Sequence, residues 1–311
     1  MSAAAVRVLL FGANGQLGSE LRRWLPRAGI ELVVPPREAA DFSRPSSLPP
    51  LVEQHRPDVV INAAAYTAVD QAESEPERCL TINGEAPGEI AAACRRIDAT
   101  LVHFSTDYVF DGRKAGAYTE DDRPSPLSAY GRSKWAGEQA IAAAGARALI
   151  LRVAWLYGID GHNFVKTMLR LSTERDSLCV VDDQWGAPTW VRTLAQWLPS
   201  VLTPVADGSP SLAERLPGTY HMAPSGRCSW YETACTVLSV AQDHPLRRRL
   251  MKIRASAVQP ITSKDYPAKA MRPANSQLDP AKACSLLSWS APLWQNDLIA
   301  CTRLLIDESV R

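Results

Sequence analysis

Short apolar stretches rich in β-branched residues alternate with longer helical patterns along the first half of this 311-residue chain. Such alternation is typical of parallel strands joined by crossover helices, so it predicts a Rossmann-type, doubly wound α/β fold. Ligands bind at the carboxyl ends of such strands, which makes the residues that follow each strand candidate functional residues. The five expected strands are 6–11, 31–34, 58–62, 101–105 and 148–153.

A glycine-rich turn follows the first expected strand directly: Gly12-Ala13-Asn14-Gly15-Gln16-Leu17-Gly18, with a helical pattern after it. In a phosphate cradle of this kind, the first glycine makes the tight turn and the second lets backbone approach a pyrophosphate. The third lets the helix pack closely on the strand. The alternative is an ordinary βα turn, but the position at the start of an α/β pattern favours a dinucleotide cofactor.

The tip of the second expected strand carries Arg37, followed by Glu38. An acidic residue at this tip bonds the ribose 2′-OH of NAD, whereas an arginine accommodates the 2′-phosphate of NADP. Arg37 therefore favours NADPH without excluding NADH, and a solvated loop arginine is the alternative. Asp41 and Phe42 are candidates for an adenine contact, or Asp41 simply caps the next helix.

Tyr130 and Lys134 form a possible proton-transfer pair in the middle of the chain. We expect a helix from an N-cap at Ser128 to Gly145, and the i, i+4 spacing places the pair on one face of it. A lysine ammonium one turn away favours a phenolate, so we expect it to lower the tyrosine pKa towards working pH. The same spacing also occurs by chance on surface helices.

Further candidates stand at the ends of other expected strands. Thr106 and Asp107 end the fourth strand, and the Thr106 hydroxyl could hold a carbonyl oxygen while Tyr130 protonates it. The small residues of 63–67 would let a cofactor lie against the backbone, or they only pack under a helix. Trp155, after the fifth strand, either walls a sugar pocket or is a rim aromatic.

The pattern loosens after residue 158 and predicts a smaller second half. We expect a cofactor domain over 1–155 and a mainly substrate-binding domain over 156–311, with some segments returning to the first. The Pro/Ser-rich stretch 203–217 is expected to be a surface loop or insertion, and the prolines of 256–280 indicate irregular structure. Helices are expected at 162–170, 191–202, 229–240 and 292–306, with strands at 178–181 and 218–222.

The composition excludes several classes of partner. With 34 basic and 33 acidic residues the net charge is +1, which gives no electrostatic case for nucleic acid or an anionic membrane. Seven cysteines without a C-x-x-C pair, and the lack of a signal-peptide or membrane-spanning pattern, predict reduced thiols and a cytoplasmic location. The histidines show no metal-ligand spacing, so no metal site is expected.

Together these motifs resemble the extended short-chain dehydrogenase/reductases and, more narrowly, the dTDP-4-dehydrorhamnose reductase family. The resemblance extends over nearly the whole chain, and the departures from it are the Pro-rich stretch 203–217 together with Trp185 and Trp190. The matching stretches are 12–18, 61–70, 105–112, 181–189, 218–221 and 272–278.

The resemblance implies that NADPH, with NADH as the alternative, reduces the C4 ketone of dTDP-4-dehydro-β-L-rhamnose to give dTDP-β-L-rhamnose. It implies that Tyr130 supplies the proton, Lys134 tunes Tyr130 and bonds the nicotinamide ribose, and Thr106 steadies the oxygen. The implied substrate contacts are Thr106, Asp107 and Trp155, with Gln184, Thr189 and Arg272 for the nucleotide end. The implied cofactor contacts are Gly12, Gly15, Gln16, Leu17, Gly18, Asp41, Phe42, Ala64, Ala65, Tyr66, Thr67 and Phe104, besides Tyr130 and Lys134.

Two other functions stay open at this point. One is an extended reductase, epimerase or dehydratase that acts on another nucleotide sugar. The other is a non-catalytic regulatory subunit, since the regulatory subunit of methionine adenosyltransferase resembles the same family; the intact Tyr130 and Lys134 pair disfavours it. Some family members are described as magnesium-linked dimers, so a homodimer stays open, but no acidic cluster here suggests such a metal site.

Overall fold

The computed structural model describes residues 5–203 and 209–310, and its central element is a parallel sheet of six strands. The strand order is β10-β5-β4-β3-β1-β2. The chain adds β2 on one side of β1 and then crosses over to add β3, β4, β5 and β10 on the other side, so the order of strands reverses between β1 and β3. The predicted doubly wound Rossmann-type fold is therefore confirmed. The strands are β1 Arg7–Phe11, β2 Glu31–Val33, β3 Val59–Asn62, β4 Thr100–Thr106, β5 Ala148–Val153 and β10 Gly218–His221.

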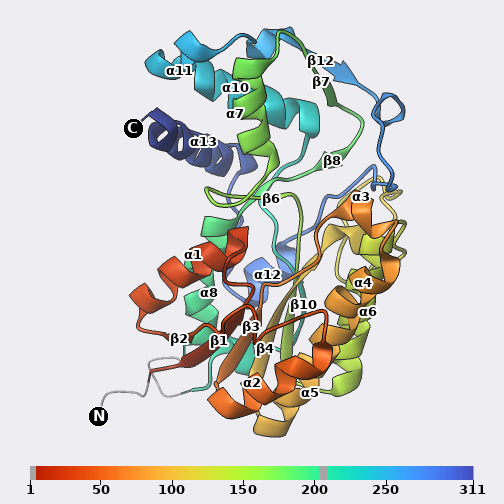
Figure 1. Cartoon of the computed structure of the whole chain (residues 1–311), viewed down its shortest axis with the longest axis vertical. Helices are drawn as coiled ribbons and strands as arrows, with labels where there is room; N and C mark the ends of the chain where they lie inside the picture. The colour runs from red at the N-terminus through yellow and green to blue at the C-terminus, as the bar shows by residue number, and fades with distance from the viewer. Residues whose placement is uncertain (1–4, 204–208, 311) are drawn as a thin grey trace.

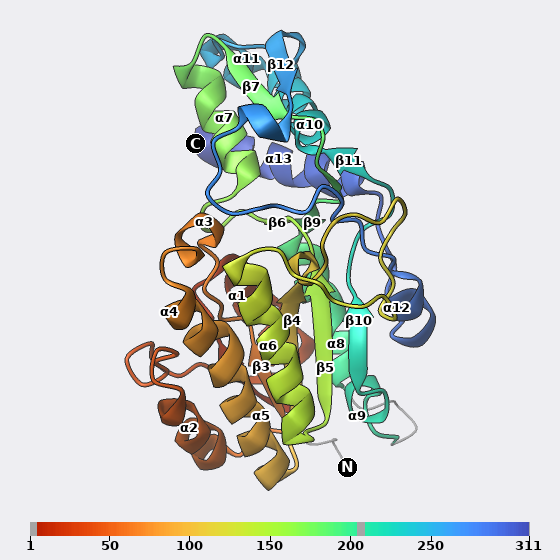
Figure 2. The same ribbon diagram turned by 90° about the vertical axis from the view of Figure 1, so that its right-hand side faces the viewer.

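Helices cover both faces of this sheet (Figures 1 and 2). Helices α1 (Gln16–Trp24) and α8 (Val191–Leu202) pack on one face. On the other face lie α2 (Leu48–His55), α5 (Ala86–Ile97) and α6 (Ala129–Ala144). Successive β1 residues point alternately into the two layers, so the strands are apolar on both sides, as expected for a buried parallel sheet.

The connection between β3 and β4 consists of several helical segments and not of one continuous helix. A short helix α3 (Val69–Ala72) comes first, and α4 (Pro76–Leu80) then passes through a π-helical turn at Thr81–Glu85 into α5. The wider turn lets the Asn83 side chain reach two other segments. Its Nδ2 donates to the Tyr66 carbonyl at 3.0 Å and to the Ser133 hydroxyl at 3.1 Å. Such turns are frequent near functional sites.

A smaller layer lies beyond the carboxyl ends of the large sheet (Figures 1 and 2). It consists of α7 (Phe164–Glu174), α10 (Trp230–Asp243), α11 (Pro245–Leu250), α13 (Trp294–Val310) and the parallel pair β7 (Leu178–Val181) and β12 (Val258–Ile261). Strand β12 corrects the expectation that 256–280 is wholly irregular, because its backbone completes the pairing of β7.

Several segments of the second half return to the large sheet. Strand β10 pairs with β5, and α8, α9 (Leu212–Arg215) and α12 (Ala281–Leu286) lie beside it. Helix α9 corrects part of the loop expected at 203–217, because the Ser211 hydroxyl and the Glu214 side chain form a capping box. Residues 204–208 of that expected loop lie outside the described residues. The division of the chain at residue 155 stays a prediction.

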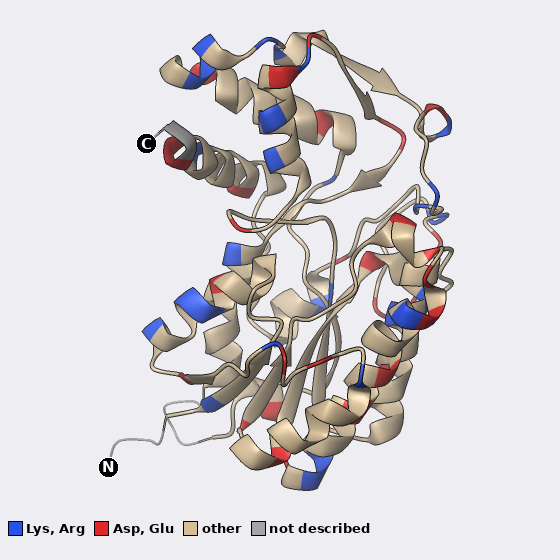
Figure 3. Cartoon of the chain, in the orientation of Figure 1, with Lys and Arg blue, Asp and Glu red and all other residues tan. Residues whose placement is uncertain are grey.

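The structure also shows how the charged residues are distributed and that the cysteines are unpaired. Acidic and basic residues are interspersed along both halves of the chain (Figure 3). All seven cysteines are free thiols. Within residues 5–203 and 209–310, no group of three or more His, Cys, Asp or Glu side chains is arranged to hold a metal ion. No helix in the same part of the chain is long and apolar enough to cross a bilayer.

A buried ion pair ties the centre of the sheet to α6. The Arg152 guanidinium on β5 donates to both carboxylate oxygens of Glu138 on α6, at 3.0 and 2.7 Å. Glu138 also accepts a hydrogen bond from the Ser105 hydroxyl, and Arg152 lies 3.4 Å from His221 Nε2 on β10. The pair therefore connects β4, β5, β10 and α6, and its two-pronged geometry offsets the cost of burying both charges.

Replacing Glu138 by alanine is expected to lower the free energy of unfolding by about 3–5 kcal/mol, because it leaves the Arg152 charge buried without a carboxylate. Urea unfolding followed by circular dichroism measures the loss. Glu53→Ala is the control, since it breaks the 2.7 Å ion pair with Arg96 at the surface and should cost about 0–1 kcal/mol. Equal losses in the two variants would contradict the assigned role of the buried pair.

Candidate active site

The glycine turn after β1 brings the backbone of three segments into contact. Gly12 has a φ of +78°, and a Cβ added there would lie 2.4 Å from the Ala64 nitrogen. A Cβ on Gly18 would lie 2.1 Å from the Gly12 oxygen. Gly15 is the N-cap of α1 and provides no side-chain cap, so the first N–H groups of α1 keep no side-chain partner there. The turn thus fits the pyrophosphate of a dinucleotide, as expected.

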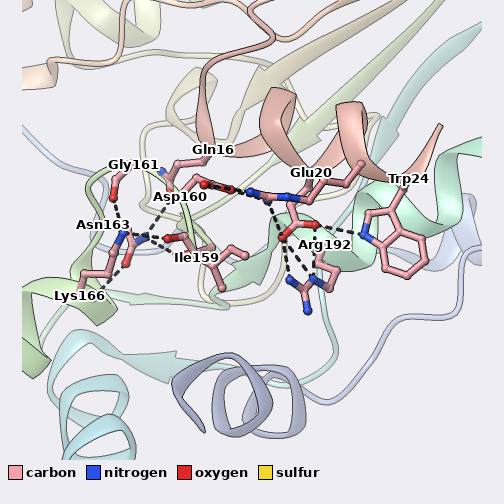
Figure 4. Close-up of polar contacts among 11 residues, drawn as sticks. Gln16, Glu20, Trp24, Ile159, Asp160, Gly161, Asn163, Lys166 and Arg192 are labelled. Carbon is pink, nitrogen blue, oxygen red and sulfur yellow. Dashed lines mark hydrogen bonds and ion pairs between the residues drawn. The ribbon is translucent and has the colours of Figure 1, made fainter. Parts of the chain in front are cut away.

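Helix α1 is fixed to the second half of the chain by polar contacts (Figure 4). The Gln16 side-chain oxygen accepts a hydrogen bond from Asn163 Nδ2 at 3.0 Å. One turn further, the fully buried carboxylate of Glu20 accepts a hydrogen bond from Arg192 on α8 at 3.1 Å. Gln16 and Leu17, two of the predicted cofactor contacts, therefore lie at the boundary between the cofactor turn and the second half.

The predicted adenine-side residues follow β2. Arg37 is exposed in the turn after the strand. The Asp41 carboxylate accepts hydrogen bonds from the Ser43 hydroxyl and backbone N–H, which lower its pKa to about 2. Asp41 therefore caps its own turn, and α2 begins only at residue 48. The Phe42 ring packs edge-on against Phe11, with the ring centroids 5.7 Å apart.

The segment 64–67, which contains four predicted cofactor contacts, runs from the end of β3 past the glycine turn. The Ala64 N–H donates to Asn62 Oδ1 at 3.1 Å. The Tyr66 N–H donates to Asn83 Oδ1 at 2.8 Å, which ties the segment to the π-helical turn. Protein groups thus hold this backbone in place close to Gly12, where a cofactor would lie against it.

Helix α6 presents Tyr130 and Lys134 as the sequence predicts. The Ser128 hydroxyl accepts a hydrogen bond from the Gly131 N–H at 3.1 Å, which confirms the N-cap. The helix ends at residue 144, and Gly145 follows with a φ of +66°. A left-handed glycine is the usual end of such a helix.

Three of the predicted residues form one cluster at the end of β4. The Tyr130 phenol lies near the Thr106 hydroxyl, which acts to lower the phenol pKa. Thr106 Oγ1 donates to Asp107 Oδ1 at 2.9 Å and accepts from the Tyr108 N–H at 3.2 Å. Asp107 Oδ2 is buried and has no hydrogen-bond partner among the described residues. The cluster therefore offers a proton donor, a bridging hydroxyl and an unpaired carboxylate oxygen.

The structure corrects the expectation that the Tyr130 pKa is lowered: this pKa is raised, and Lys134 is not among the main causes of the shift. Desolvation raises the pKa of the Tyr130 phenol well above its ordinary value and outweighs the opposing Thr106 hydrogen bond. Lys134 is itself buried, and its Nζ donates to the Phe104 carbonyl at 2.6 Å. Desolvation lowers the Lys134 pKa to about 8, against the charge of Glu138. Tyr130 is therefore protonated at neutral pH and suited to donate a proton.

Trp155 is held in a constrained position beyond β5. Its φ is +50°, which is a left-handed conformation. This conformation is rare for a bulky residue, and residues that adopt it are often found at functional sites. The Trp155 ring stacks on Trp230 with centroids 3.7 Å apart, and a Cβ added to Gly186 would lie 2.7 Å from it. A small cavity of about 70 Å³ lies beside the stack, lined by Tyr157 and Phe164 among others. Trp155 thus forms part of an aromatic wall.

The residues predicted for the nucleotide end have protein partners of their own. Gln184 Nε2 donates to the Ser263 hydroxyl at 2.9 Å, and Thr189 is buried in the short strand β9 (Thr189–Trp190). Arg272 forms a 2.9 Å ion pair with Asp70 on α3, so it joins the C-terminal segment to the first half. A cavity of about 350 Å³ lies beside this pair, lined by Asp70, Gln71, Ser74, Pro267 and Lys269.

Two buried polar residues that the sequence prediction omitted also contact this site. His103 Nε2 lies 3.3 Å from Lys134 Nζ, and His103 Nδ1 lies 3.1 Å from Asn62 Nδ2. The sequence does contain a signal that could have identified these two residues. Asn62 ends the otherwise apolar β3, and His103 interrupts the apolar run 101–104 of β4, whereas a parallel strand buried on both faces has few polar positions of this kind.

Comparisons with known proteins agree along the whole chain. A family model described as the RmlD substrate binding domain matches residues 6–306. The dTDP-4-dehydrorhamnose reductase of Burkholderia thailandensis is 40% identical, over 97% of this chain and 100% of its own length. A crystal structure of a dTDP-4-dehydrorhamnose reductase from Clostridium acetobutylicum is 34% identical, with a TM-score of 0.86 over 97% of this chain and 100% of that one. The enzyme from Bacillus anthracis, solved in complex with NADP, is 35% identical, with a TM-score of 0.85 over 96% and 99%.

Replacing Thr106 by valine is expected to raise the Asp107 pKa by roughly one unit, because the variant loses a hydrogen bond to the carboxylate. Burial already raises this pKa to about 6, and the Ser276 and Thr106 hydroxyls oppose that rise. A carbon-13 NMR titration of the aspartate carboxyl groups measures the change. Asp111 lies outside the cluster and is the internal reference. An Asp107 pKa that stays the same or falls would contradict the bridging role of Thr106.

Proposed function

Because this chain belongs to the dTDP-4-dehydrorhamnose reductase family, we propose that it reduces the C4 ketone of dTDP-4-dehydro-β-L-rhamnose to dTDP-β-L-rhamnose with NADPH. This reaction is the last step of dTDP-L-rhamnose synthesis. One observation carries the proposal: a protonated tyrosine, a threonine hydroxyl and an aspartate meet at the end of β4, on the same edge of the sheet as the glycine turn.

Each residue of the site has its own role in this reduction. When bound, the reduced nicotinamide supplies the hydride that adds to the ketone carbon. Tyr130 gives its proton to the oxygen that would otherwise become an alkoxide, and its raised pKa keeps that proton in place beforehand. The Thr106 hydroxyl, which donates to Asp107 Oδ1 before the reaction, can then turn its hydrogen towards the phenolate. Asp107 Oδ2, which is buried and unpaired, is placed to accept a hydrogen bond from a sugar hydroxyl.

The main alternative functions differ in their use of cofactor. An epimerase on the same fold would keep its nicotinamide and need no added NADPH, and a non-catalytic subunit would consume none. Incubating the purified chain with NADPH and several 4-keto nucleotide sugars, while following the absorbance of the reduced cofactor, separates them. Consumption that depends on the dTDP-4-keto sugar supports the reductase. No consumption with any sugar would refute it.

Other expectations about partners and location stay predictions. The proposed small-molecule partner is a dTDP-sugar. A cytoplasmic location is predicted from the sequence, which leaves a homodimer open. Light scattering on the purified chain measures the oligomeric state.

Replacing Tyr130 by phenylalanine should lower kcat by ~10²-fold or more while NADPH binding changes little, because the ring stays and only the proton donor is lost. Steady-state kinetics and fluorescence titration with NADPH measure both. The matched control is Tyr220→Phe, which removes a phenol bonded to the Leu216 carbonyl elsewhere on the sheet. Near-normal turnover of the Tyr130 variant would exclude Tyr130 as the donor.

Replacing Arg37 by alanine should reduce the preference for NADPH over NADH, because an arginine at this strand tip suits a 2′-phosphate. A loss of about tenfold in the ratio of the two kcat/KM values is expected, the size of one charge-assisted hydrogen bond. Arg27→Ala, at an arginine that lies over the Trp24 ring at the far end of α1, is the control. If the ratio is the same in both variants, Arg37 does not read the phosphate.

A further inference from the structure

Three buried polar side chains form a continuous chain from β3 through β4 to α6. Asn62, His103 and Lys134 are 1%, 0% and 1% exposed. Asn62 Nδ2 lies 3.1 Å from His103 Nδ1, and His103 Nε2 lies 3.3 Å from Lys134 Nζ. The parallel register pairs Asn62 with His103 directly, so the contact is built into the sheet. Buried polar groups are costly unless they are hydrogen-bonded, and each of these three has its partner in the chain.

The backbone fixes the direction of the first hydrogen bond. The Ala64 N–H donates to Asn62 Oδ1 at 3.1 Å, so the amide turns its Nδ2 towards His103. Nδ2 can only donate, and His103 Nδ1 must therefore accept. In a neutral imidazole the proton then resides on Nε2, the nitrogen that faces Lys134. Burial and the nearby Lys134 lower the His103 pKa well below its ordinary value, which keeps the ring neutral.

This tautomer decides which form of Lys134 it can bond. A lysine ammonium has three donors and no acceptor, so it would place an N–H against the Nε2–H of His103. The uncharged amine can accept that hydrogen while it donates to the Phe104 carbonyl at 2.6 Å. The hydrogen-bond directions therefore weaken proton binding by Lys134, in the same direction as the lowering of its pKa to about 8 by desolvation.

The charged and titratable groups that face Lys134 stabilise its ammonium form only in part. Glu138, one turn further on α6, favours the charge, but its carboxylate is already held by both arms of Arg152. Cys79 on α4 also favours it, yet burial raises the thiol pKa, so Cys79 is uncharged at neutral pH. Tyr130 on the same helix is protonated for the reason given above.

We propose that Asn62 and His103 are positioning residues for the reductase reaction: they hold Lys134 in place and, through the Nε2–H of a neutral His103, weaken its affinity for a proton. The inference deepens the proposed function and rests on it for its catalytic meaning. Tyr130 must regain its proton after each turnover, and a lysine that changes protonation near working pH without moving can take part in that exchange. Neither residue touches the reacting atoms.

A purely structural role would make a different prediction. If the chain only fastened β3 and β4 to α6, removing a link would lower stability and leave the proton affinity of Lys134 unchanged. The tautomer of His103 and the pKa of Lys134 are therefore the decisive measurements. Both can be read in the protein without cofactor, so they do not depend on the reductase activity.

The first measurement needs no variant except for assignment. The chain contains 5 histidines, so nitrogen-15 NMR of imidazole-labelled protein gives few signals, and His103→Gln identifies the one that belongs to His103. A neutral ring protonated on Nε2 is expected throughout the pH range around neutrality. A ring protonated on Nδ1, or a charged imidazolium at neutral pH, overturns the proposal.

The second measurement follows the carbon-13 signal next to the amine of labelled lysines, with Lys134→Met for assignment. Asn62→Ala frees His103 to change tautomer, so the Lys134 pKa is expected to rise by about one unit. Asn62→Asp should reverse the tautomer outright and raise it further. Asn83→Ala is the matched control, because it removes a buried amide bonded to Tyr66 and Ser133, and should leave this pKa unchanged.

A Lys134 pKa that equals the wild-type value in folded Asn62→Ala and Asn62→Asp proteins overturns the proposal, as does an equal rise in the Asn83 variant. In the active enzyme, the alkaline limb of the kcat profile should move upwards with the Lys134 pKa. If the NMR results hold but no nucleotide sugar is reduced, the chain of contacts stands and the proposed reaction fails.

Discussion

The burial of Lys134 is the constraint on which the arrangement of the site depends. A lysine amine with almost no contact with water must find its partners within the protein, and here they are the Phe104 carbonyl and the His103 ring. Both belong to β4, so α6 has to lie very close to that strand. Gly131 permits this at the end of the strand, since a Cβ there would lie 2.3 Å from the Tyr108 oxygen. Gly137 permits an equally close approach of α6 to the π-helical turn, since a Cβ there would lie 2.2 Å from the Asn83 oxygen. The close approach in turn brings Tyr130 to Thr106.

Desolvation also sets the proton affinities of the site. It raises the pKa of Asp107 to about 6 and lowers that of Lys134 to about 8, so both groups titrate near working pH. It raises the pKa of Tyr130 in the same way and keeps the phenol protonated. The ion pair of Arg152 and Glu138 lies in the same region, but the two charges satisfy each other through two hydrogen bonds. Burial thus shifts the pKa values of those groups whose charge no partner fully compensates.

The two halves of the chain meet at more than one place around the site. Glu20 and Arg192 fasten the cofactor helix to α8, and Asp70 and Arg272 fasten α3 to the C-terminal segment. The second contact uses an arginine that the family resemblance assigned to the nucleotide end of the substrate. The pairing with Asp70 gives Arg272 a role in holding the two segments together, and the cavity of about 350 Å³ at Asp70 adjoins the same contact.

The sequence by itself determined the elements whose causes are local. Apolar runs predicted the strands, the glycine spacing predicted the turn before α1, and Ser128 with the i, i+4 spacing predicted how α6 presents Tyr130 and Lys134. The tertiary structure alone decided the rest. The direction of the Tyr130 pKa, the pairing of Arg272 and the chain through Asn62 and His103 depend on strand register and on exclusion of water. Neither can be read from residues that are near one another in sequence, because both arise between segments that fold together from distant parts of the chain.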